Sequence, residues 1–134
     1  MDFDLIVRGG TLPDGRVADI GIAGETIAAI EPRLDAKAGK EVDARGNLVS
    51  PPFVDPHFHM DATLSYGIPR FNASGTLLEG IALWGELKPL LTHEAVRERA
   101  LAYCDWAVSM GLLAIRTHVD VCDDRLLAVE ALLD

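Results

Sequence analysis

The segment Pro51-Pro52-Phe53-Val54-Asp55-Pro56-His57-Phe58-His59-Met60-Asp61 decides the fold prediction for this chain. It is a short apolar run that ends in two histidines spaced two residues apart. Side chains at positions i and i+2 of a β-strand point to the same face, so His57 and His59 can converge on one ion. Neutral imidazole is a preferred ligand of zinc and iron. The segment therefore predicts a strand that delivers two metal ligands at its carboxyl end.

A histidine pair also occurs as a hydrogen-bonded polar spot, and two ligands alone hold a metal weakly. The surroundings of this pair favour the metal. A Pro-Pro entry and a Val-Asp-Pro lead-in stand before the histidines, and Asp61 follows them. Together they form a longer and rarer signature than His-x-His.

Helices and a second strand follow this segment. Residues 76–87 have helical character, and Thr92 is a good N-cap for a second helix that Gly111 ends. A strand is predicted over residues 112–121, and a further helix from Asp124. The order strand, helix, strand, helix is a βαβα unit, which predicts that the two strands are parallel neighbours.

The alternation of polar and apolar residues predicts which side chains meet across these two strands. We expect Arg116 to pair with Asp55, because a buried arginine needs a partner. The polar faces consist of Asp55, His57 and His59 on the first strand and Arg116, His118 and Asp120 on the second.

The first 50 residues show a different pattern, with short apolar strands separated by turns that contain Gly and Pro. Such close spacing is typical of a small β-sandwich or meander. We therefore place a domain boundary between residues 50 and 51.

The motifs from about residue 45 to the end resemble the amidohydrolase superfamily and, within it, the bacterial cytosine deaminases. Residues 1–44 match that family only loosely. The resemblance rests on separate motifs in the same order: the first strand over 51–61, the loop Asn72-Ala73-Ser74-Gly75-Thr76-Leu77-Leu78-Glu79-Gly80-Ile81, Trp84, the turn Leu90-Leu91-Thr92-His93, and the second strand Arg116-Thr117-His118-Val119-Asp120-Val121.

The resemblance implies an α/β fold, the N-terminal part of a metal-dependent (β/α)8 amidohydrolase barrel. Residues 51–134 would be its first two βα units, and residues 1–50 part of a small β-sandwich domain that precedes them. A closed barrel typically needs about 250 residues, and the chain has 134. We therefore expect a truncated barrel, inactive by itself.

The implied activity is deamination of cytosine or a related amino-substituted heterocycle by metal-activated water. The resemblance assigns His57 and His59 to one divalent ion, zinc or iron, and Leu77 to the substrate pocket. Asp61 and His118 would lie in the pocket or behind the ligands, although spacing alone leaves His118 open as a third ligand. The acid–base groups are expected beyond Asp134, so no catalytic residue is assigned.

Two alternatives stay open. One is an amidohydrolase that acts on an isocytosine, a triazine or a cyclic amide, and the other is a non-catalytic α/β binding module.

Composition limits the partners. The net charge of −9, from 21 acidic and 12 basic residues, argues against nucleic acid, because such binders present a basic face. No apolar run is long enough to cross a membrane. Two cysteines are too few for a disulfide framework, which favours the cytoplasm. A small heterocyclic substrate is the expected partner, and a homo-oligomer of the complete protein is left open.

Overall fold

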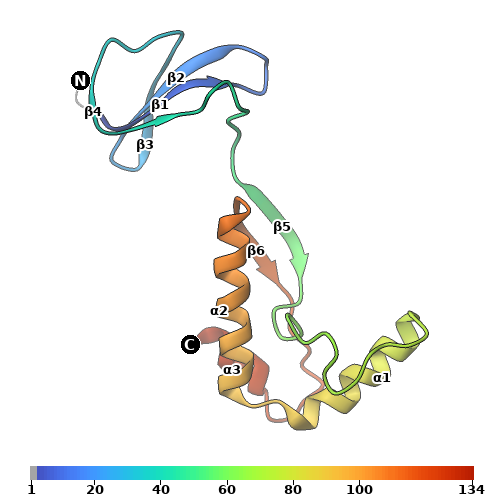
Figure 1. Ribbon diagram of the computed structural model, residues 1–134. Coiled ribbons are helices and arrows are strands. Elements are labelled where there is room, and N and C mark those ends of the chain that lie inside the picture. The colour runs from blue at the N-terminus through green and yellow to red at the C-terminus, as the bar shows by residue number, and fades with distance from the viewer. Residues whose placement is uncertain (1–2) are drawn as a thin grey trace. The chain divides into compact units, whose positions relative to one another are not determined.

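The computed structural model describes residues 3–134, which divide into two compact units (Figure 1). The described residues up to Pro51 form the first unit, and Pro52–Asp134 form the second. Each unit has its own sheet and its own hydrophobic cluster.

The first unit is a four-stranded sheet with the strand order β3-β2-β1-β4. Strand β1 pairs antiparallel with β2 and parallel with β4, and β2 pairs antiparallel with β3. Leu12, Ala18 and Ile20 form its buried cluster. Leu48 adds a single isolated bridge to Thr11. The strands are β1 (Phe3–Thr11), β2 (Val17–Ala23), β3 (Thr26–Glu31) and β4 (Ala38–Asp43).

The second unit is a strand–helix–strand–helix arrangement around two parallel strands, as predicted (Figure 1). Parallel pairing brings the carboxyl ends of β5 and β6 to the same edge of the sheet. The elements are β5 (Phe53–Phe58), α1 (Leu77–Leu87), the 3-10 turn η1 (Lys88–Leu90), α2 (His93–Ser109), β6 (Leu112–Thr117) and α3 (Leu127–Leu133).

Local signals explain where the helices start and stop. The side chain of Thr76 accepts a hydrogen bond from the backbone N–H of Glu79, and Thr92 caps α2 through the N–H of Ala95. Each hydroxyl satisfies one N–H that the first helical turn leaves free. Gly111 follows α2 with φ of +79°, a left-handed conformation that glycine adopts without steric cost.

Phe58, at the end of β5, packs against α2. The ring of Phe58 stacks on that of Tyr103, with centroids 4.3 Å apart. Helix α2 also contacts β6 and α3. The buried cluster beneath these helices consists of Leu87, Leu91, Val96, Ala128 and Ala131. His57 lies in β5, and His59 follows directly after the strand ends at Phe58.

Three expectations from the sequence need correction. Strand β6 ends at Thr117 rather than Val121, and α3 begins at Leu127 rather than at Asp124. The predicted pair of Arg116 with Asp55 is wrong. Arg116 is exposed and forms no ion pair with the described residues. The Asp55 carboxylate instead accepts the backbone N–H of His57, at 3.0 Å.

Within residues 3–134, no helix combines the length and the apolar character that crossing a membrane requires.

Candidate active site at the carboxyl ends of β5 and β6

Three histidine rings gather where β5 and β6 end. The His57 ring stacks on His118 with centroids 3.9 Å apart, and the His59 ring lies 5.5 Å from His57 and 5.9 Å from His118. The shared face predicted for these histidines is therefore confirmed. The backbone N–H of His118 donates to the carbonyl of Phe58, at 2.7 Å, and this bond fixes its place beside β5.

Asp61 is the most deeply placed polar side chain of the site, with no exposed surface. One carboxylate oxygen accepts the backbone N–H of Asp120, at 2.8 Å, and the other accepts that of Ala62, at 3.0 Å. The second oxygen also lies 3.4 Å from Nδ1 of His59. Asp61 thus joins the segments that follow β5 and β6 and lies against one of the histidines.

Asp120 connects the end of β6 to α1. Its carboxylate accepts the indole N–H of Trp84, and Lys88 Nζ lies 3.2 Å from the same oxygen. The backbone N–H of Cys122 and the indole of Trp84 hold the pKa of this carboxyl far below its usual range. Because Asp120 also donates its own N–H to Asp61, a continuous chain of contacts runs from α1 to His59.

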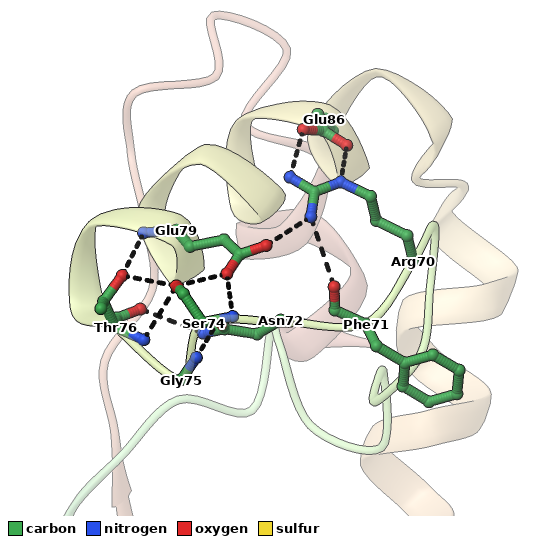
Figure 2. A network of polar contacts seen from close by, with 8 residues as sticks. All are labelled: Arg70, Phe71, Asn72, Ser74, Gly75, Thr76, Glu79 and Glu86. Carbon is green, nitrogen blue, oxygen red and sulfur yellow. Dashed lines mark hydrogen bonds and ion pairs between the residues drawn. The ribbon is translucent and has the colours of Figure 1, made fainter.

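Side chains of the loop before α1 form hydrogen bonds to the backbone of the same loop (Figure 2). The Asn72 amide donates to the carbonyl of Thr76, at 3.0 Å, and its oxygen accepts the N–H of Gly75, at 2.8 Å. The hydroxyl and N–H of Ser74 and the guanidinium of Arg70 lower the pKa of Glu79 to about 2, so this carboxylate is ionised at neutral pH. This motif fixes the backbone just before Leu77.

A cavity of about 730 Å³ connects these parts. Its volume is within the range of small-molecule sites, about 300–1,000 Å³. The cavity is lined by both polar and apolar side chains, and the apolar ones predominate. The lining includes His59, Asp61, Asp120, Arg70, Asn72, Tyr66, Ile68, Leu77, Ile81, Leu83, Trp84 and Leu87.

The structure brings together most of the residues singled out in the sequence. His59, Asp61 and Leu77 line one cavity, whereas the stacked pair of His57 and His118 is not part of its described lining. Sequence reasoning gave no site role to Asp120, Trp84 or Arg70. Trp84 and Asp120 stand in the motifs that carry the family resemblance, but their hydrogen bond joins positions 36 residues apart and no local pattern predicts it.

The donor chemistry of the histidine cluster fits zinc or iron, because both ions accept neutral imidazole. Nδ1 of His118 is buried without a hydrogen-bond partner among the described residues. Within residues 3–134, however, no three His, Cys, Asp or Glu side chains are placed to hold a metal ion. The chain therefore offers suitable donors but not a complete ligand set.

Comparison with known proteins identifies the class of enzyme. The Amidohydrolase family model matches residues 40–133. The chain belongs to this family, and its α/β fold matches the N-terminal portion of an amidohydrolase domain.

Its relatives include N-isopropylammelide isopropyl amidohydrolase of Pseudomonas sp. strain ADP, which is 38% identical over 99% of this chain. The 5-methylcytosine deaminase of Klebsiella pneumoniae, solved with phosphonocytosine, superimposes with a TM-score of 0.85 at 39% identity over 96% of this chain. N-isopropylammelide isopropylaminohydrolase of Burkholderia multivorans gives a TM-score of 0.74 at 29% identity over 97% of this chain. The chain spans 34%, 32% and 33% of these proteins, respectively.

Proposed function

We propose that this chain is the first part of an enzyme that removes the exocyclic amino group of cytosine or a related heterocycle by hydrolysis. We call the protein that contains this chain and the remainder of the barrel the complete enzyme. The observation that carries the proposal is the cavity in which His59 and Asp61 face Leu77 and Trp84. In this cavity the imidazole of His59, a common metal ligand, lines the same space as apolar side chains.

The apolar wall suits a flat ring. Leu77, Ile81 and Trp84 come from one helix and line the same cavity. Apolar and aromatic side chains bind the faces of a ligand, while a few polar groups fix its orientation. Likeness to a 5-methylcytosine deaminase, solved with phosphonocytosine and with 5-fluorocytosine, supports a pyrimidine as the substrate class.

His57 and His59 would hold one divalent ion, zinc or iron, with further ligands from later strands. When bound, such an ion lowers the pKa of water from about 15.7 to near 7 and so supplies a nucleophile at neutral pH. The residues of this chain would position the metal ligand and the substrate, because Asp61 orients His59 and Leu77 contacts the heterocycle. The groups that move protons to the departing amine would come from beyond Asp134. We place the complete enzyme in the cytoplasm.

The role of Asp61 leads to a prediction. In the complete enzyme, Asp61→Ala should lower the free energy of unfolding by about 1–3 kcal/mol, because a buried N–H loses its acceptor. It should also weaken metal binding about 10- to 100-fold, as loss of a group that orients a ligand typically does. Urea titration and metal competition measure the two effects.

Asp105→Ala is the matched control, because the Asp105 side chain is exposed on α2 and forms no hydrogen bond or ion pair with the described residues. It should change neither quantity. Metal affinity that is unchanged by Asp61→Ala would contradict the orienting role.

A second candidate is hydrolysis of an N-alkylated amino group. It is favoured by the relative from Pseudomonas, whose name states an isopropyl amidohydrolase acting on N-isopropylammelide. The apolar wall of the cavity is compatible with an alkyl group as well as with a ring face.

The experiment gives the complete enzyme cytosine, 5-methylcytosine, N-isopropylammelide, isocytosine and a cyclic amide, and measures ammonia, isopropylamine and ring opening. Ammonia from a pyrimidine supports the first proposal, and isopropylamine from N-isopropylammelide supports the second. Hydrolysis of an isocytosine or a cyclic amide instead would assign another substrate class. An enzyme that binds metal and hydrolyses none of these compounds would favour the non-catalytic binding module.

A further inference from the structure

We propose that Arg70 is a positioning residue for substrate binding: it holds residues 70–76 against α1 and so sets the place of Leu77. The inference rests on the proposed function, because it gives Leu77 a substrate to contact. Arg70, Asn72 and Leu77 all line the same cavity. Arg70 lies outside the motifs on which the family resemblance rests.

Arg70 spans two turns of α1 (Figure 2). Its Nε and Nη2 donate to the two oxygens of Glu86, at 3.1 and 2.9 Å, and its Nη1 donates to Glu79, at 2.7 Å. Glu79 and Glu86 are seven residues apart, which puts them on one face of the helix. A planar guanidinium is suited to this arrangement, because its donors match a carboxylate in pairs.

Glu79 closes the other end of the segment. The carboxylate oxygen that does not face Arg70 accepts both the N–H and the hydroxyl of Ser74. Thr76 caps the same helix through the N–H of Glu79. Arg70 and Ser74 therefore both donate hydrogen bonds to the Glu79 carboxylate. Helix α1 begins at Leu77, directly after the loop that these bonds hold.

The network acts locally. The Arg70 side chain is 45% exposed, and exposed ion pairs contribute little to global stability. Its removal should therefore loosen residues 70–76 without unfolding the protein. A looser segment leaves Leu77 spread over several positions, which weakens substrate binding more than it slows the chemistry performed elsewhere in the barrel.

The test is Arg70→Met in the complete enzyme, with Arg125→Met as the matched control. Arg125 is 46% exposed and also bridges a carboxylate and a carbonyl, those of Asp123 and Lys88, but it does not line the cavity in the described part of the chain. We expect Arg70→Met to raise KM about tenfold with kcat within about twofold, because the apparent affinity falls by the fraction of molecules in which Leu77 is correctly placed. The control should leave both unchanged.

Arg70→Lys keeps the charge but not the paired donors, so its KM should lie between those of the wild type and Arg70→Met. A purely structural role predicts less active enzyme instead, with a lower apparent kcat and an unchanged KM. That result would overturn the inference.

Amide hydrogen exchange gives a second readout that needs no turnover. Residues 72–79 should exchange faster in Arg70→Met than in the wild type or in Arg125→Met. Unchanged exchange there would overturn the inference even if KM rises. A wild-type enzyme without turnover would instead contradict the proposed function, and exchange would still decide whether Arg70 holds the loop.

Discussion

Replacing His57 and His59 together by asparagine in the complete enzyme should remove the bound metal and lower kcat on the order of a thousandfold or more. Asparagine retains a polar side chain but not the imidazole nitrogen that zinc and iron prefer. Without the ion, water keeps its pKa of about 15.7 and almost no hydroxide forms at neutral pH. Metal analysis and amine release measure the two losses on the same sample.

His93→Asn is the matched control. His93 is at the start of α2, paired with Asp134 at 3.0 Å, away from the histidine cluster. The control should keep both metal and turnover. If the variant without His57 and His59 keeps stoichiometric metal and its turnover, these histidines are not the ligands and the metal assignment fails.

The second large effect concerns Leu77. Leu77→Arg should reduce kcat/KM on the order of a hundredfold, because it puts a charge where an uncharged ring is expected to pack. Stability should change little, because the Leu77 side chain is 79% exposed in this structure. Steady-state kinetics with the best substrate and thermal unfolding separate the two quantities.

Leu78→Arg tests whether the position rather than the charge matters. Leu78 is equally exposed at 79%, but it is not among the described residues that line the cavity. Its kcat/KM should stay within about threefold of the wild type, because surface substitutions usually change free energies by no more than about 0.5 kcal/mol. Equal losses in both variants would remove Leu77 from the substrate pocket.

Local chemistry made the elements of the second unit predictable. The cap at Thr92 and the glycine at Gly111 are short-range signals, and the structure uses both, whereas Thr76, expected inside the first helix, caps it instead. The alternation predicted that the His57 and His59 rings lie near each other, and they do, although His59 follows the last residue of β5. Phe58, on the other face of the strand, stacks on Tyr103 of α2.

The errors arise where a long-range contact competes with a local pattern. The alternation after Thr117 continues, but Asp120 donates its N–H to the side chain of Asp61 instead of to a neighbouring strand. Arg116 does lie in β6, next to β5, but the alternation gave no evidence for the residue that it pairs with. Asp55 is used locally, by the N–H of His57.

The candidate site was predictable only in part. His59, Asp61 and Leu77 could be chosen from motifs, but their common cavity depends on how the loop before α1 folds. The link from Asp61 to Asp120 joins positions 59 residues apart, and Arg70 reaches Glu86 across 16. Such contacts depend on the packed structure, and no periodicity of the sequence encodes them.

The most direct measurement follows turnover of cytosine by the complete enzyme while its metal is removed with a chelator and then restored. We predict that ammonia release falls in proportion to the metal lost and returns with one equivalent of zinc or iron per chain. The His57 and His59 double variant should not recover. Ammonia release at the full rate from metal-free enzyme would contradict a metal-dependent deaminase built on this site.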